Sequence, residues 1–223
     1  MTPLQLAVAY AAIANGGKVL KPQVVREVRD AKGNLLEEKQ AVVTAEIGLD
    51  QHNLDLMKEA LAHVTDAGGT ASGLLWRRDR YAAMSEWLRN SGITIVGKTG
   101  TAQVVRLSKS VAHVDAKDVP YEQRDHSWFV GFAPYNHPEI VVVTMTEHGG
   151  FGGSVSGPVT GEVLKTWFTR VRGKGRYAGL PPIEPTKRIV PAPKKDETTE
   201  ESARHSHEPE EDDKAIVEGG IEP

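Results

Sequence analysis

The sequence predicts an α+β fold, in which an antiparallel sheet carries helices on its faces. Two strand-like runs, residues 127–133 and 140–146, flank a proline- and asparagine-containing segment that is typical of a hairpin turn. Apolar residues recur at helical spacing in other stretches of the chain. An antiparallel hairpin combined with separate helices is an α+β arrangement.

The composition divides the chain into a folded part and a tail. The 223 residues carry a net charge of −3, but residues 195–223 hold eleven acidic residues against three basic ones. This stretch therefore carries −8, which leaves +5 for residues 1–194. A segment rich in proline, acidic and hydroxyl-bearing residues cannot bury enough apolar surface to offset its ordering entropy. We predict a folded portion over residues 1–180 and a Pro-rich, then acidic, disordered tail over residues 181–223.

Composition also excludes several classes of function. The chain has no cysteine, so disulfides and thiol nucleophiles are absent. No window approaches the ~20 apolar residues that a membrane-spanning helix needs, and the first residues do not resemble an export signal. The positive charge of the folded part suits an anionic substrate but is too scattered for nucleic acid, so no nucleic-acid partner is expected. No metal or cofactor is expected either.

The first predicted helix begins at the N-terminus. Thr2 is suited to an N-cap and Pro3 to the first helical position, and the apolar run reaches Ala14 before the glycine pair 16–17. Because the run is apolar on nearly every face, this helix should be buried in a larger body.

The middle of the chain predicts a hairpin and further helix. Residues 24–28 and 35–36 flank a Lys-Gly-Asn turn and indicate the hairpin. Residues 50–65 carry apolar side chains at helical spacing and predict an amphipathic helix, whereas residues 70–91 predict a partly helical excursion.

The second half predicts the sheet and a closing helix. A long strand is expected from Ile93 to about Arg106, followed by a polar loop over residues 108–124. Residues 127–133 should form a strand with two useful faces, and its three large aromatic residues are expected in the core. Valine or tryptophan then recurs at every fourth position of residues 155–171, which predicts a helix that packs on the sheet through this stripe.

Residues 92–99, GITIVGKT, match the phosphate-binding pattern G-x-x-x-x-G-K-[ST]. A P-loop requires a helix that starts at the lysine, but extended, β-branched residues surround Lys98 on both sides. We therefore place Lys98 on a strand, and a nucleotide site remains a less favoured alternative.

Several blocks of sequence surround Lys98-Thr99-Gly100-Thr101, and each resembles a block of the class B penicillin-binding proteins of the penicillin-binding protein 2 type. The Lys-Thr-Gly tripeptide itself matches the third active-site motif of the penicillin-binding transpeptidases and serine β-lactamases. The other blocks lie in the family's order across about residues 1–170: TPLQLA to NGG near the N-terminus, DHSWFVGFAP from Asp125, and EHGG from Glu147.

This resemblance implies a peptidoglycan D,D-transpeptidase fold and a set of site residues. Lys98 and Thr101 are the implied catalytic residues: Lys98 supplies positive charge, and the Thr101 N–H is an oxyanion donor. Thr99, Gly100 and Thr101 are implied to bind the substrate, a peptidoglycan stem peptide ending in D-Ala-D-Ala, and β-lactams bind at the same site in the full-length family. An exposed lysine and threonines on an edge strand can also simply discourage aggregation.

Two histidines are candidates for residues that line the cleft. His126 follows an aspartate, but neighbouring residues on a strand point to opposite faces, which argues against a catalytic pair. His148 lies beside the glycines at 149, 150, 152 and 153, which are expected to shape a loop near the cleft.

The family's nucleophile is absent from this sequence. No serine has lysine three positions later, as in S-x-x-K, and none has asparagine two positions later, as in S-x-N. In the family both motifs precede the block at Thr2, so the resemblance covers the C-terminal part of a transpeptidase domain. We expect the chain alone to be inactive and to expose surfaces that the missing part would cover.

The resemblance also implies a setting. Full-length relatives lie at the periplasmic face of the inner membrane and work with the elongation machinery, so the missing N-terminal part of the domain and elongation proteins are the expected partners. The alternative is a non-catalytic remnant that binds cell-wall peptides or a partner protein.

Overall fold

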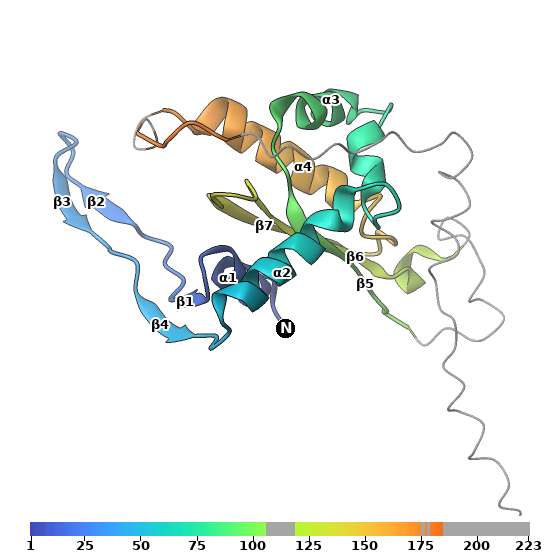
Figure 1. Ribbon diagram of the computed structural model, residues 1–223, viewed down its shortest axis with the longest axis horizontal. Coiled ribbons are helices and arrows are strands. Elements are labelled where there is room, and N and C mark those ends of the chain that lie inside the picture. Colours follow the sequence, from blue (N-terminus) through green and yellow to red (C-terminus); the bar gives the residue numbers. More distant parts are fainter. Residues whose placement is uncertain (106–118, 175–176, 178, 185–223) are drawn as a thin grey trace, which may run out of the picture.

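The computed structural model describes residues 1–105, 119–174, 177 and 179–184, and a three-stranded antiparallel sheet forms its centre. The strands are β5 (Val96–Ala102), β6 (His126–Ala133) and β7 (Ile140–Thr146), in that order across the sheet. Helices cover both faces (Figure 1). The predicted α+β class is therefore confirmed. The predicted tail lies almost entirely outside the described residues.

The middle strand β6 is buried on both of its faces. Phe129 has no exposed surface and packs with α3 (Ala82–Ser91) and α4 (Ser156–Thr166). Phe132 is equally buried and packs on the opposite face with α1 (Pro3–Ala14) and α2 (Gln51–Ala62). Two apolar layers thus enclose the sheet, as the two-faced pattern of residues 127–133 predicts. Trp128 is only half-buried.

The predicted hairpin between β6 and β7 is confirmed. The strands pair antiparallel from Ser127 opposite Thr146 to Ala133 opposite Ile140. β5 pairs with the other edge of β6, with Lys98 opposite Val130 and Ala102 opposite His126. Among the described strands β5 has no partner on its outer side, so its outward backbone groups form one edge of the sheet.

Helix α1 begins as its sequence predicts. Thr2 and Gln5 form a reciprocal capping box, and Pro3 occupies the first turn. The expected burial is not found in this chain: only Ala12 is buried, and Leu4 is 60% exposed. The reason is that only one side of α1 contacts the sheet, so its other apolar side lacks a covering element among the described residues. The predicted exposure of apolar surface is confirmed.

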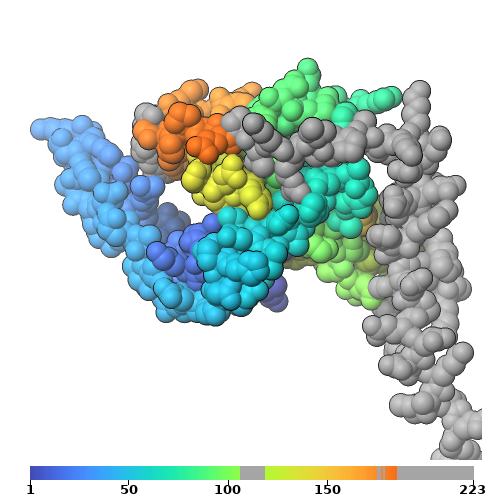
Figure 2. Space-filling model, in the orientation of Figure 1, coloured from blue at the N-terminus to red at the C-terminus, as the bar shows by residue number. Residues whose placement is uncertain are grey.

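The segment after α1 forms an extended arm. β2 (Glu27–Arg29) and β3 (Leu35–Glu38) make the predicted hairpin, and β1 (Lys18–Leu20) pairs with β4 (Val43–Glu46) at its base. The arm leaves the main body in Figure 1 and protrudes at the left of Figure 2. Its strands are shorter than the sequence suggests, and β3 and β4 are exposed throughout.

Helical elements connect the arm to the sheet. The predicted amphipathic helix is α2, capped by the Asp50 side chain and continued by the 3₁₀ turn η1 (His63–Thr65). The predicted partly helical excursion contains the 3₁₀ turn η2 (Ser72–Trp76) and helix α3. No helix in the described ranges is both long enough and apolar enough to cross a bilayer.

The strand that carries Lys98 is shorter than predicted. Gly92 ends α3 in the left-handed region, with a φ of 68°, and residues 93–95 then enter the core without joining the sheet. Ile93 and Ile95 are buried there, so their apolar character reports burial and not strand pairing. The strand begins at Val96 and ends at Ala102. Most of the predicted loop 108–124 lies outside the described residues, and Tyr121–Gln123 form a short 3₁₀ turn, η4.

The closing helix exists, but its valine stripe does not pack on the sheet. The face of α4 that meets the core is built from small residues with one leucine: Ser156, Gly157, Thr160, Gly161 and Leu164. Small side chains allow close approach: a Cβ added at Gly161 would lie 2.6 Å from the sulfur of Met84. The predicted stripe therefore faces outward, with Val159 37% and Val163 43% exposed.

The outward stripe lines an open apolar groove beside β7. The π-helical turn η5 (Trp167–Val171) extends α4, and its two end residues join Val159, Val163 and Ile140 in this groove. The groove ends near an ion pair in which the Arg172 guanidinium donates to both oxygens of Glu139, at 2.7–3.0 Å. Both side chains are only 12% exposed, and the hydrogen bonds from Arg172 to Glu139 raise the pKa of Arg172.

Two adjacent residues of α4 test this orientation. Leu164→Ala removes a side chain with no exposed surface and should lower the free energy of unfolding by about 2–5 kcal/mol. Val163→Ala removes exposed atoms and should cost less than about 1 kcal/mol. Urea unfolding of both variants measures the difference. A larger loss for Val163→Ala would contradict the orientation.

Candidate functional site

The Lys-Thr-Gly-Thr segment lies on the edge strand β5. The side chain of Lys98 is exposed, and its Nζ donates a hydrogen bond to the Thr99 carbonyl at 3.1 Å. Because side chains alternate along a strand, Lys98 and Gly100 share one face, and Thr99 and Thr101 share the other. A P-loop would require a helix that starts at Lys98, but the strand continues through the lysine to Ala102.

The two threonines of the segment differ in exposure. Thr99 is 8% exposed, and its hydroxyl donates to the Thr70 hydroxyl at 2.8 Å, which ties β5 to the segment after η1. Thr101 is exposed near the end of the strand. Thr101 is therefore the accessible hydroxyl in this arrangement. Substrate binding by Thr99 stays a prediction and would require its hydroxyl to leave Thr70.

Gly149, Gly150, Gly152 and Gly153 follow β7 and form a loop, the glycine loop, that lies against the backbone of β5. A Cβ added at Gly152 would lie 2.6 Å from the carbonyl oxygen and 2.9 Å from the nitrogen of Gly100, and 2.2 Å from the Trp128 carbonyl oxygen. At Gly153 it would lie 2.2 Å from the Thr70 carbonyl oxygen. The loop thus packs on Gly100 backbone to backbone. The predicted loop is therefore present and lies against the Lys98 strand, and its place beside a substrate cleft stays a prediction.

His126 and His148 meet at the end of the strand pair β5–β6. The His148 N–H donates to Nδ1 of His126 at 3.0 Å, and the two rings lie edge to face with centroids 4.8 Å apart. Nδ1 of His148 lies 3.0 Å from the Arg124 carbonyl oxygen. His126 also faces Ala102 across the ladder. The structure therefore brings the two histidines together beside the Lys98 strand.

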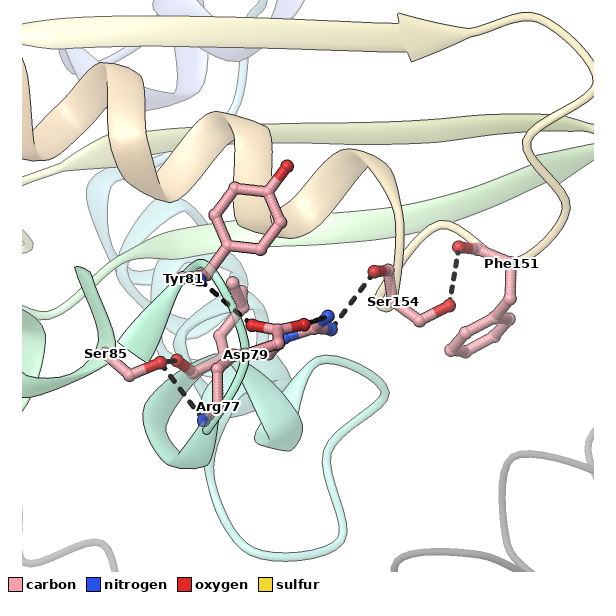
Figure 3. Close-up of polar contacts among 7 residues, drawn as sticks. Arg77, Asp79, Tyr81, Ser85, Phe151 and Ser154 are labelled. Atoms are coloured by element: carbon pink, nitrogen blue, oxygen red, sulfur yellow. Dashed lines mark hydrogen bonds and ion pairs between the residues drawn. The ribbon is translucent and has the colours of Figure 1, made fainter. Parts of the chain in front are cut away.

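The far end of the loop is held by an arginine. The Arg77 guanidinium donates to the Ser154 carbonyl oxygen at 3.2 Å and also binds the Asp79 carboxylate (Figure 3). The same guanidinium lies over the ring of Tyr81, 5.5 Å from its centroid. These contacts fix Arg77 between η2 and α3, so the segment after η2 positions the loop's end.

Two buried serine hydroxyls fix the start of α4, directly after the glycine loop. Ser127 on β6 lies 2.7 Å from Ser156 at the start of α4, oxygen to oxygen, and neither residue has exposed surface. The Ser156 hydroxyl also donates to the Ser127 carbonyl at 2.9 Å. This pair fixes the start of α4 against β6, directly after the glycine loop.

Several of these supporting residues carry no sequence signal of their role. Thr70 and Arg77 lie in no motif, and Ser127 lies in the block that begins at Asp125, but nothing local relates any of them to Lys98. The glycine spacing was a usable signal for close packing, but it did not reveal that Gly100 would be the partner. The orphan oxygen Oδ1 of Asp125, buried without a hydrogen bond among the described residues, was also not foreseen.

Comparison with known proteins agrees with this geometry. The family model described as the penicillin-binding protein transpeptidase domain matches residues 1–165. The chain belongs to this family. The Lys98 strand and the glycine loop both lie inside the matched residues, so they can be interpreted as parts of a transpeptidase domain.

Relatives of the family place the chain more closely. The chain is 34% identical over 155 residues to the peptidoglycan D,D-transpeptidase MrdA of Acinetobacter baumannii, and the aligned region covers 70% of this chain and 20% of that protein. For MrdA of Haemophilus influenzae the identity is 27%, covering 90% of this chain and 27% of the relative. The chain therefore spans about a quarter of the length of these relatives and resembles the penicillin-binding protein 2 type within the family.

A solved structure supports the same assignment. The chain resembles PBP2 of Pseudomonas aeruginosa with a TM-score of 0.54 and 31% sequence identity, covering 82% of this chain and 33% of that one. PBPA of Mycobacterium tuberculosis, at 20% identity and a TM-score of 0.52, shares the fold. The antiparallel sheet with helices on both faces is thus the fold of a penicillin-binding transpeptidase domain, of which this chain is one portion.

The contact between Gly152 and Gly100 generates a prediction. Gly152→Ala places a Cβ 2.2 Å from the Trp128 carbonyl oxygen of β6 and 2.6 Å from the Gly100 carbonyl oxygen of β5, so either the loop or the sheet must shift, and we expect a loss of about 1–3 kcal/mol in the free energy of unfolding. Gly73→Ala is the matched control, because nothing lies within 4 Å of an added Cβ there. Urea unfolding measures the stability of both variants, and the NMR chemical shift of the Gly100 amide reports any change at the contact. Equal effects would contradict the contact.

The Arg77–Asp79 pair predicts a pH dependence. The hydrogen bond from Arg77, followed by one from the Tyr81 N–H, lowers the pKa of Asp79 from 3.8 to about 2. Because the folded state holds the lower pKa, the stabilisation is present above about pH 4 and is lost as the pH falls through about 2. Urea unfolding at several pH values should show Asp79→Asn less stable than wild type at pH 6. The difference in the free energy of unfolding between the two proteins should shrink towards pH 2, and a difference that does not change with pH would refute the coupling.

Proposed function

We propose that this chain provides the substrate-strand side of a peptidoglycan D,D-transpeptidase site. The observation that carries the proposal is the position of Lys98, Gly100 and Thr101 on a strand whose outer edge is unpaired among the described residues. An unpaired edge can accept an extended peptide by backbone hydrogen bonding, with pockets and charges selecting its side chains. The relatives of this chain named MrdA are peptidoglycan D,D-transpeptidases.

The residues of β5 suit a peptide that ends in a carboxylate. Lys98 presents an exposed ammonium group, a compact positive charge that attracts the terminal carboxylate of D-Ala-D-Ala. Thr101 offers an exposed hydroxyl to the same carboxylate. Gly100, between them, has no side chain to obstruct a ligand backbone. Together these groups orient the substrate along the strand.

The backbone of β5 also suits the developing charge of acyl transfer. Attack on the penultimate D-alanine carbonyl moves negative charge onto its oxygen, and the Thr101 N–H is our proposed donor to that oxygen. A donor fixed on a paired strand needs no reorganisation during the reaction, and such a donor typically contributes ~3 kcal/mol. The nucleophilic serine and its lysine would come from a part of the domain outside this sequence.

Several further assignments belong to this proposal. Residues 1–180 form the transpeptidase portion, and residues 181–223 form the separate tail. The working protein binds β-lactams at the same site, acts at the periplasmic face of the inner membrane, and works with other elongation proteins. The apolar surface on α1 and the groove on α4 support this, because both suit a covering by the remainder of the domain.

Covalent labelling by a fluorescent penicillin tests the proposal. The 223-residue chain alone should not be labelled, because it lacks S-x-x-K. A chimaera in which residues 1–180 replace the matching segment of Acinetobacter baumannii MrdA should be labelled. Lys98→Ala in the chimaera should slow labelling on the order of 100-fold. Lys32→Ala, on the exposed arm, is the control and should leave the rate unchanged.

The outcomes separate the alternatives. A labelled 223-residue chain would refute the proposed division of the site. A folded but unlabelled chimaera would favour a non-catalytic module that binds cell-wall peptides. Sequencing the DNA upstream of the Met1 codon adds an independent check, because S-x-x-K and S-x-N in the same reading frame would support the transpeptidase assignment.

A further inference from the structure

The glycine loop is joined by a compact set of hydrogen bonds to residues 124–126, which lead into β6. The His148 N–H donates to Nδ1 of His126 at 3.0 Å, and the Gly150 N–H donates to the Asp125 carbonyl oxygen at 2.9 Å. Nδ1 of His148 approaches the Arg124 carbonyl oxygen at 3.0 Å. Three successive residues of one segment thus bind the first residues of the loop.

These contacts determine the position of the proton on each imidazole. A nitrogen that accepts a hydrogen bond must carry a lone pair, so the contact requires the tautomer of His126 that has its proton on Nε2. A carbonyl oxygen only accepts, so Nδ1 of His148 carries a proton. The arrangement therefore requires a particular tautomer at His126, and a proton at its Nδ1 would face the His148 N–H and break the contact.

The backbone at His148 indicates that these bonds hold the chain in an unfavourable conformation. His148 has a φ of 52° and is the non-glycine residue in the left-handed region within the described residues. Side chains other than glycine disfavour this region. The turn nevertheless sends the chain from β7 directly into the loop that packs on Gly100. The orientation of the loop therefore depends on the contacts that hold His148.

We propose that His126 and His148 are positioning residues that set the glycine loop on the substrate strand through the Nδ1 acceptor of His126. The loop backbone lies against Gly100, between Lys98 and Thr101, so its placement determines whether β5 keeps the geometry that a peptide substrate needs. Neither histidine acts on the substrate in this proposal. The consequence for catalysis rests on the proposed function, whereas the hydrogen bonds that position the loop do not depend on it.

A matched pair of substitutions isolates the acceptor. His126→Asn keeps an acceptor oxygen at the position of Nδ1 and loses the rest of the ring. His126→Phe keeps a ring and loses the acceptor. If the acceptor positions the loop, amide hydrogen exchange at His148 and Gly150 should accelerate roughly tenfold in the Phe variant and stay near wild type in the Asn variant. The opposite order would show that ring packing holds the loop, and would overturn the proposal.

The tautomer provides a spectroscopic readout. Ring-nitrogen NMR shifts of the 223-residue chain at neutral pH should place the His126 proton on Nε2 and the His148 proton on Nδ1. A proton on Nδ1 of His126 would refute the proposal without any substitution. His148→Gly adds a second test, because glycine adopts a positive φ freely and keeps the backbone donor, so protection of its own amide should survive.

The consequence for catalysis is measured in the chimaera described above. His126→Phe should slow penicillin acylation about tenfold, and His126→Asn should restore most of the rate. If the wild-type chimaera is never labelled, the proposed function fails, but the exchange and ring-nitrogen measurements still decide the role of the histidines. If both variants label at the wild-type rate while exchange differs, the positioning role in catalysis is overturned.

Discussion

The close contact between the backbones of Gly152 and Gly100 is the constraint on which the arrangement of this site depends. No side chain fits between the two, so the loop after β7 can lie this close to β5 only with glycine at this position. Its first residues are hydrogen-bonded to residues 124–126, and its last is bonded to Arg77. The buried Ser127–Ser156 pair then starts α4 at a defined place. A substrate strand, a loop and a closing helix are thereby fixed relative to one another.

Sequence was sufficient for the elements whose signals are local. The N-cap of α1, the hairpin of β6 and β7, and the amphipathic helix α2 depend on local sequence signals, and all three are present in the structure. The family was also predictable, because the blocks around Lys98 and Asp125 are contiguous in the chain. The positions of the two histidines beside the Lys98 strand required the sheet register, which the sequence alone did not provide.

Two of the errors have a common physical origin. Ile93 and Ile95 resemble strand residues, but they enter the core outside the sheet. The valines of α4 resemble a core-facing stripe, but they face outward. In both cases the apolar pattern predicted residues that pair in the sheet or pack on it, but these residues lie elsewhere in the fold. On α4 the small residues occupy the core-facing side because they allow the helix to approach Met84 of α3 and Phe129 of β6 closely. Tertiary packing therefore overrode the hydrophobic pattern.

The ion pair between Glu139 and Arg172 has a consequence for the limits of the folded unit. The family match ends at residue 165, but the guanidinium that neutralises the turn between β6 and β7 lies seven residues further on. A polypeptide trimmed to the matched region would lose both the Arg172 guanidinium and the Trp167 ring N–H, the two groups that hydrogen-bond the Glu139 carboxylate. The folded unit therefore extends at least to Arg172, beyond the residues that the family model matches.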